Sequence, residues 1–303
     1  VYPEVYRKFV SNLSPINLDL DFILSYSCLF ESDFYDHLLV ATTAPLLVLV
    51  LLAGSYLVAK RRNRSRNSSS SSSSESARLA VLHKHQAAVL YLAFFVYSPV
   101  SYKIFQTFAC DALDDGDSYL RADYSVSCLT SRHSWYETYS LVMVGVYPVG
   151  IPAVFAWLIG RHRHDLVKEN REELVQLKPL YGLWAAYKPS RYFYEVIECV
   201  RRNTLTAIAA FVLPGTTAQI SIVLLFAVVF VFVSEVISPF EKPADMNLYR
   251  WGNGIIVASM YVAFLMKIDV GYDTKQALLT FSGVLIAANL FMVVTILLQT
   301  ALL

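Results

Sequence analysis

Seven stretches of mainly apolar residues recur along this 303-residue chain, and each is about as long as the ~20 residues that an α-helix needs to cross a membrane. They lie at 38–59, 87–108, 137–160, 193–213, 218–238, 249–267 and 277–301. Only 16% of the residues are charged, against about 25% in soluble domains. The sequence therefore predicts an all-α, polytopic integral membrane protein, with a seven-transmembrane-helix bundle over 38–303 and an extracellular juxtamembrane segment at 1–37.

The connections between these stretches alternate in charge. Those after the first and third stretches are rich in lysine and arginine. The connection after the second holds mainly aspartates, with few arginines: Asp111, Asp114, Asp115, Asp117, Asp123, Arg121 and Arg132. Basic residues next to membrane helices stay on the cytoplasmic side. We therefore expect the N-terminus outside, the C-terminus inside, and an acidic extracellular loop at 109–136.

The first cytoplasmic loop, 60–86, contains a basic block and the unbroken serine run 68–74. A segment of this composition cannot bury apolar surface, which predicts a disordered tether. The block can bind anionic lipids, or it can act only as a topology signal. Its arginines are Arg61, Arg62, Arg64 and Arg66.

The second cytoplasmic loop, 161–192, has leucines at helical spacing, with basic residues on or near the opposite side. These leucines are Leu166, Leu174, Leu177 and Leu180. The pattern predicts an amphipathic helix that lies along the inner leaflet of the membrane.

Three of the four cysteines, Cys28, Cys110 and Cys128, fall in segments expected outside the cell. Cys110 and Cys128 flank one short loop in an oxidising compartment, so a disulfide between them is the simplest pairing. Cys28 can replace either partner, which leaves three pairings open.

Two further features of the outer segments have alternative interpretations. The run Asp114-Asp115-Gly116-Asp117 offers oxygen ligands for calcium, but it lacks the spacing of a calcium-binding loop, which favours a solvated loop and no metal site. Asn12 begins an Asn-Leu-Ser sequence, which is either a glycosylation acceptor or a chance match.

The fourth apolar stretch opens with charged residues spaced three and four apart: Arg191, Glu195, Glu198 and Arg202. This spacing places all of them on one face of a helix. The intramembrane charge stripe can couple the preceding loop to the helix bundle. It can equally mark an interfacial helix end, where long charged side chains reach the lipid headgroups.

The third apolar stretch contains Pro148, Gly150 and Pro152. Prolines within a helix remove backbone hydrogen bonds, so we expect a helix kink here. Such kinks occur in the moving helices of channels and transporters, and also in static bundles.

Nothing in the sequence predicts catalysis, so we expect neither enzymatic activity nor a cofactor. There is no phosphate-binding loop and no nucleophile elbow. The histidines beside the membrane stretches lack acidic or cysteine partners at metal-binding spacing: His83, His85, His162 and His164. No soluble domain presents the basic blocks to nucleic acid.

Several motifs resemble those of large surface proteins of algae, diatoms and oomycetes. They are Phe105-Gln-Thr-Phe-Ala-Cys110, Tyr119 to Cys128 with His133, Val146 to Pro152, and Tyr194 to Arg202 before Leu213-Pro-Gly215. In those proteins, cysteine-rich extracellular repeats precede a terminal multi-span region described as transient-receptor-potential-like. The resemblance implies plasma-membrane localisation and an extracellular domain of the same chain as a partner. A start at Val1, without methionine or signal peptide, fits the expectation of an excerpt from a longer protein.

Three functional classes remain. The resemblance implies a channel-like or transport-like sensor of the cation-channel type, although the outer loop 267–275 is short for a pore helix and filter. The topology also permits a seven-helix receptor coupled to G proteins, but Gly160-Arg-His-Arg stands where that class has Asp-Arg-Tyr. A non-conducting anchor for an extracellular stalk is the third class. An oligomer is possible in each case.

Overall fold

The computed structural model describes residues 4, 6, 8, 9, 33–66, 71–113, 116–168, 170–211, 216–268 and 275–301. Over these residues the chain is mainly helical, and it divides into two compact units. Unit 1 comprises Val1–Phe30 and Arg201–Leu303, and unit 2 comprises Glu31–Val200.

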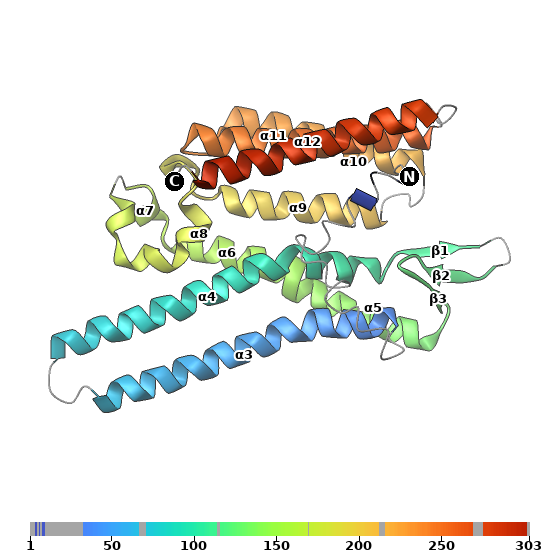
Figure 1. Ribbon diagram of the computed structural model, residues 1–303. Helices are drawn as coiled ribbons and strands as arrows, with labels where there is room; N and C mark the ends of the chain where they lie inside the picture. Colours follow the sequence, from blue (N-terminus) through green and yellow to red (C-terminus); the bar gives the residue numbers. More distant parts are fainter. Residues whose placement is uncertain are drawn as a thin grey trace. The chain divides into compact units, whose positions relative to one another are not determined.

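Two long helices form a hairpin at the start of unit 2 (Figure 1). Helix α3 spans Phe34–Arg66, helix α4 spans Ser71–Gln106, and the two pack along each other. The predicted tether 60–86 is therefore helical up to Arg66 and again from Ser71, while 67–70 lie outside the described residues.

The acidic loop folds into a small antiparallel sheet, which the all-α prediction did not include. Its strands are β1 (Cys110–Ala112), β2 (Ser118–Leu120) and β3 (Asp123–Ser127), in the order β1-β2-β3. Gly116, with φ of 88°, lies in the connection between β1 and β2, and aromatic and β-branched side chains follow in β2 and β3. Such residues favour extended backbone, and glycine takes positive φ without steric cost.

The next rod of unit 2 is helical throughout but changes its winding midway. It runs from α5 (Ser131–Val144) through a π-helix, η2 (Gly145–Val149), into α6 (Gly150–Arg161). The side chain of Thr130 caps α5 by accepting a hydrogen bond of 3.2 Å from the His133 N–H. This cap satisfies one backbone donor that the first helical turn leaves unpaired.

The predicted amphipathic helix over 161–192 is wrong. The structure instead has the short helical elements α7 (Arg163–Leu166), η3 (Arg171–Glu173), η4 (Val175–Leu180), α8 (Tyr181–Trp184) and η5 (Pro189–Arg191). Pro179 and Pro189 lack the N–H that a continuous helix requires. The leucines that suggested this helix point into the core of unit 2 instead. There Leu166, Leu177 and Leu180 pack with Phe155 and Trp184.

Unit 1 contains three long helices downstream of α9 (Tyr194–Phe211) among its described residues: α10 (Thr217–Ile237), α11 (Pro243–Lys267) and α12 (Lys275–Ala301). Helix α11 packs against both α10 and α12. Arg250 of α11 donates two hydrogen bonds of 2.7 Å to Glu235 of α10, which fixes the register of that pair.

Five helical segments in the described part of the chain are long and apolar enough to cross a membrane: Phe34–Arg62, Arg78–Gln106, Ser131–Arg161, Thr217–Ile237 and Leu279–Leu298. Helices α9 and α11 occupy the other two predicted positions but lie outside this group. The charged residues of α9, and Arg250 with Asn253 in α11, lower the apolarity of these two helices.

Candidate functional site

The residues expected to kink the third stretch lie in and just after the π-helix η2. Pro148 lies within it, Gly150 begins α6, and Pro152 lies in the first turn of α6. Because Pro148 cannot donate a backbone hydrogen bond and its ring crowds the preceding turn, a wider turn accommodates it. Functional helices often carry such wide turns.

Buried hydroxyl groups connect this wide turn to α3. The Tyr147 hydroxyl donates to the Thr42 carbonyl oxygen at 2.6 Å, and the Thr42 and Tyr139 hydroxyl oxygens lie 2.6 Å apart. Thr42 is fully buried and Tyr147 is nearly so. Hydrogen bonds in an apolar interior hold their partners firmly, because neither partner can exchange to water. The network therefore fixes η2 against α3.

Cys110 and Cys128 form the disulfide expected between them. The buried His133 ring lies beside it, with Nε2 3.6 Å from Cys110 Sγ and 3.4 Å from the Glu137 Oε1 atom. Its Nδ1 atom hydrogen-bonds the Tyr35 hydroxyl at 2.8 Å. We name Cys110, Cys128, His133 and Glu137 the outer cluster, after the acidic loop that the sequence predicts to be extracellular. It joins the sheet to α5, and Tyr35 joins it to α3.

The small sheet also secures the start of α3. Asp123 Oδ2 accepts a hydrogen bond from the Phe34 N–H at 3.2 Å, and its Oδ1 accepts from the Ser125 N–H and hydroxyl. Partial burial opposes ionisation of Asp123, but the hydrogen bonds from Ser125 and Phe34 outweigh it and lower the pKa of the carboxyl. An ionised carboxylate is also favourable at a helix N-terminus.

A second carboxylate holds the sheet together. The Arg121 guanidinium donates from Nε and Nη2 to Asp111, and the Tyr124 hydroxyl donates to Asp111 Oδ2 at 2.7 Å. These hydrogen bonds, that from Arg121 foremost, lower the pKa of Asp111 below its usual value of 3.8. This pair connects β1 to the turn that follows β2.

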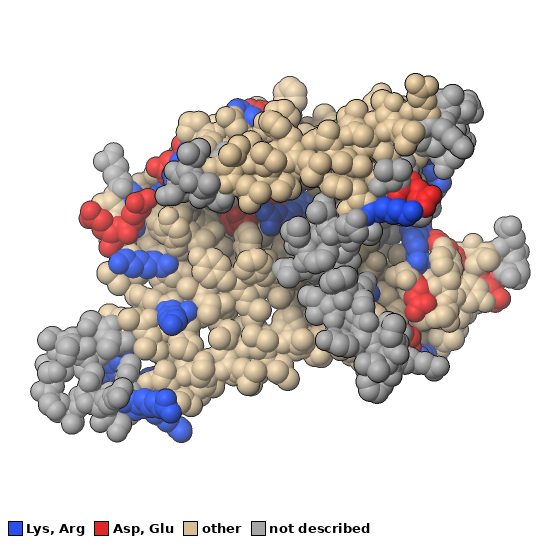
Figure 2. Space-filling model, in the orientation of Figure 1, with Lys and Arg blue, Asp and Glu red and all other residues tan. Residues whose placement is uncertain are grey.

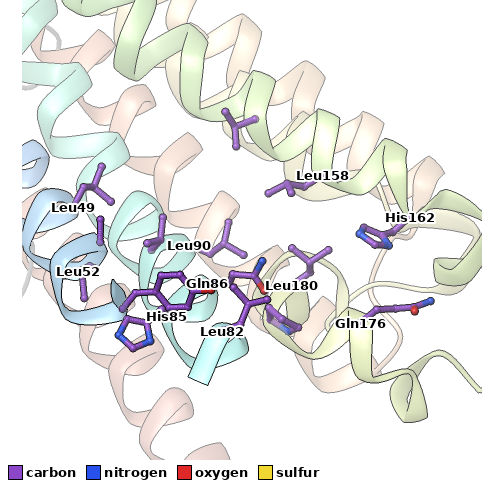
Figure 3. A pocket seen from close by; sticks show the side chains of 15 residues that line it. Leu49, Leu52, Leu82, His85, Gln86, Leu90, Leu158, His162, Gln176 and Leu180 are labelled. Carbon is purple, nitrogen blue, oxygen red and sulfur yellow. The ribbon is translucent and has the colours of Figure 1, made fainter. Parts of the chain in front are cut away.

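An inner cavity of about 360 Å³ opens between α3, α4, α6 and η4 within unit 2 (Figure 3). Its walls are mainly leucine, valine and proline side chains, with Leu49 and Leu52 on one side and Leu158 on another. Polar groups interrupt the lining at Tyr56, His85, Gln86, His162 and Gln176. Cavities of this size and composition, apolar with a few placed polar groups, commonly bind small molecules.

His85 is held in place at the edge of the inner cavity. Its Nδ1 lies 2.8 Å from the Val81 carbonyl oxygen, and its Nε2 lies 3.0 Å from the Ser55 hydroxyl of α3. Tyr56 packs edge-on against the same ring. The histidine therefore bridges the two hairpin helices, a role that the sequence did not indicate.

The predicted charge stripe is only partly buried. Glu195 and Glu198 are each 4% exposed, whereas Arg191 and Arg202 are intermediate in exposure. Glu195 Oε2 accepts a hydrogen bond of 2.5 Å from the Tyr187 hydroxyl. Burial of both carboxylates argues against a freely solvated helix end for this part of the stripe.

Arg171, in η3 of unit 2, is a further buried charged residue. It is 3% exposed, donates to the Tyr187 carbonyl oxygen at 2.7 Å and lies over the Trp184 ring at 4.8 Å. The sequence placed it in a basic flank, because a chain position alone does not reveal that the loop folds back into the core.

The basic block lies at the far end of the α3–α4 hairpin (Figure 2). Arg61 and Arg62 are exposed there, and Arg64 and Arg66 have no described side chains. Asn12, Cys28, Asp114 and Asp115 lie outside the described residues, so the predictions made for them stay predictions.

His133 is the functional candidate that the sequence reasoning missed as a ligand. The sequence signal for this role was that His133 lies five residues after Cys128. A single turn between them can bring the His133 side chain back toward the cysteine. Among the described residues, Cys110, Cys128 and His133 form the one group of potential metal ligands, with ligand atoms within 4.8 Å of one another.

Comparison with protein-family models, with curated proteins and with solved structures finds no match to this chain. Functional inference therefore rests on the geometry of the outer cluster, the π-helix and the inner cavity.

Proposed function

We propose that the chain is the multi-span membrane domain of a larger cell-surface protein and acts as a channel-like sensor of the transient-receptor-potential-like cation type. The observation that carries this proposal is the inner cavity of about 360 Å³, which lies among helices apolar enough to cross a membrane. An anchor for a stalk needs no such cavity, whereas a sensor needs a place for its stimulus to act.

The proposed topology has seven membrane helices, with the N-terminus outside and the C-terminus inside, in the plasma membrane. Two features of unit 2 support it. The disulfide and the acidic sheet follow the end of α4, and the basic block lies at the opposite end of the α3–α4 hairpin. Disulfides favour an oxidising exterior, and basic flanks favour the cytoplasm.

The lining of the inner cavity suits an amphipathic molecule, such as a lipid tail with a hydrogen-bonding end. Its apolar part would contact Leu49, Leu52 and Leu158, and its polar part would meet His85 or Gln176. Anionic lipid can also bind at the C-terminal end of α3, at Arg61, Arg62, Arg64 and Arg66.

A coupling route runs from the inner cavity to the wide turn. The cavity is lined by α3 and α6, α6 follows η2, and Tyr147 ties η2 to Thr42 of α3. A ligand that separates α6 from α3 must therefore bend the rod at η2. Helices bend at such interruptions rather than along regular turns.

Whole-cell current recording from cells that express the protein tests this proposal. We expect a cation current that Leu49→Trp reduces, because the larger side chain fills the inner cavity. Leu47→Trp is the matched control, since Leu47 lies on the same helix and is 62% exposed. Surface labelling normalises the amount of each variant at the membrane.

The other functional classes give different outcomes. Equal currents from both tryptophan variants would remove the inner cavity from the mechanism. A second-messenger response without current would favour the receptor class. Neither current nor second-messenger response would favour a non-conducting anchor.

A further inference from the structure

The outer cluster has the composition of a zinc site once its disulfide is opened. We propose that, after reduction of the Cys110–Cys128 disulfide, the two thiolates and His133 Nε2 bind one Zn²⁺ ion, with Glu137 as the fourth ligand. Zinc binds cysteine sulfur, histidine nitrogen and carboxylate oxygen in tetrahedral sites. The proposal does not depend on whether the protein conducts ions.

The distances already approach those of a coordinated ion. Ligand atoms about 2.3 Å (sulfur) and 2.05 Å (nitrogen) from a tetrahedral zinc lie roughly 3.5 Å apart. In the structure, Cys110 Sγ and His133 Nε2 are 3.6 Å apart. A nitrogen and an oxygen ligand would be separated by about 3.3 Å, and His133 Nε2 lies 3.4 Å from Glu137 Oε1. The ligand atoms of Cys110, Cys128 and His133 all lie within 4.8 Å of one another, and opening the disulfide lets the two sulfurs move apart.

The surroundings of His133 match those of a metal-binding imidazole. Its Nδ1 atom faces the Tyr35 hydroxyl at 2.8 Å, and the ring is 1% exposed. When Nδ1 carries the proton and donates to the Tyr35 oxygen, Nε2 presents its lone pair toward Cys110. Partners of this kind fix the ring orientation of zinc-binding histidines and support the affinity of the site.

The chemistry balances with an external thiol reductant. A dithiol transfers two electrons to the Cys110–Cys128 bond, becomes a cyclic disulfide and leaves two protein thiols. Zinc binding then releases two protons to solvent as both thiols become thiolates. The disulfide and the zinc ion compete for the same two sulfur atoms, so the oxidised protein should not bind the ion at this position.

The test uses the whole chain in detergent with Cys28→Ser and Cys199→Ser, which leaves only Cys110 and Cys128 as cysteines. One sample is kept oxidised, and the other is reduced with a phosphine that is then removed without oxygen. Both are titrated with Co²⁺, whose visible spectrum distinguishes tetrahedral coordination from the octahedral coordination of the hydrated ion. Zn²⁺ is then added as competitor.

We expect one Co²⁺ per reduced chain, with tetrahedral bands, a thiolate charge-transfer band, and full displacement by Zn²⁺. The oxidised sample should show none of these, and it serves as a control with an identical sequence. Tyr35→Phe should keep the spectrum of the reduced protein but weaken binding by about tenfold, because the partner of Nδ1 is lost.

A spectrum of equal intensity from the oxidised sample would overturn the proposal, because the sulfurs would not be ligands. Absence of tetrahedral bands in the reduced sample would overturn it as well. A second readout is the rate at which the disulfide re-forms in air. Bound Zn²⁺ should slow this reaction, and an unchanged rate would contradict coordination by both cysteines.

Discussion

A Cβ atom on Gly150 would lie 2.8 Å from the carbonyl oxygen of Gly145, across the wide turn of η2. Real Cβ atoms do not approach backbone oxygens so closely, and backbone cannot move aside as a flexible side chain can. The π-helix that accommodates Pro148 therefore also requires glycine at position 150. The close approach of Gly150 to Gly145 therefore makes the wide turn a specific packing arrangement, because it leaves no room for a side chain at position 150.

We predict that Gly150→Ala lowers the free energy of unfolding by about 1–3 kcal/mol, as overpacking does in well-packed interiors. Gly145→Ala is the matched control, because a Cβ there meets no atom within 4 Å. Alanine also favours helix over glycine by about 1 kcal/mol, so the control should be neutral or stabilising. Thermal unfolding in detergent measures both variants, and equal midpoints would contradict the π-helical geometry.

The proposed topology predicts which parts of the chain antibodies reach in intact cells. An epitope tag near residue 117 should be accessible, because it lies next to β2 in the sheet that carries the Cys110–Cys128 disulfide, which is proposed to face the cell exterior. Tags at 66–76 and near 170 should be protected until the membrane is permeabilised, since basic flanks stay inside. An accessible tag in the serine run would reverse the orientation.

The sheet formed by β1, β2 and β3 should lose stability in acid. The pKa of Asp111 is lower in the folded protein than its usual value of 3.8, because Arg121 hydrogen-bonds the carboxylate. A carboxyl group whose pKa is lowered by folding stabilises the folded protein at pH values above the pKa of the unfolded state. This contribution disappears as the pH falls through about 4 and below. Asp111→Asn should therefore lower the thermal midpoint at neutral pH and flatten its acid dependence.

Tyr124→Phe provides a comparison for that measurement, since it removes one hydrogen bond to Asp111 but leaves Arg121 in place. It should retain most of the acid dependence. Identical pH profiles for wild type and Asp111→Asn would exclude a contribution of this carboxylate to stability.

The sequence predicted the positions of the helices well, because length and apolarity are properties of each segment alone. It also predicted the Cys110–Cys128 pairing, since two cysteines eighteen residues apart in one loop have few other partners nearby. It failed where tertiary packing decides. The leucines of 161–192 have helical spacing, yet Pro179 breaks the helix and Leu166 and Leu177 enter the core of unit 2.

The sites were less accessible to sequence reasoning than the helices. His133 and Tyr35 are ninety-eight residues apart, and no local pattern indicates that their side chains meet. The inner cavity likewise requires α3, α4, α6 and η4 together. The charge stripe was visible as a periodicity, but the Tyr187 hydroxyl that donates to Glu195 precedes helix α9 and lies in no helical register with it.

The hydrogen bond between Tyr187 and Glu195 gives the last prediction. Both residues are 4% exposed, and the Tyr187 hydroxyl donates to Glu195 Oε2 at 2.5 Å. Tyr187→Phe removes this donor from a buried carboxylate and should cost about 1–3 kcal/mol of unfolding free energy. Tyr181→Phe is the control, because Tyr181 is 54% exposed and should change stability by less than about 0.5 kcal/mol.

Glu195→Gln retains an amide oxygen as acceptor, so adding Tyr187→Phe to it should cost less than Tyr187→Phe alone if the charge strengthens the bond. Equal costs in both backgrounds would mean that the negative charge of Glu195 does not strengthen this hydrogen bond, because the amide oxygen of glutamine would accept it equally well.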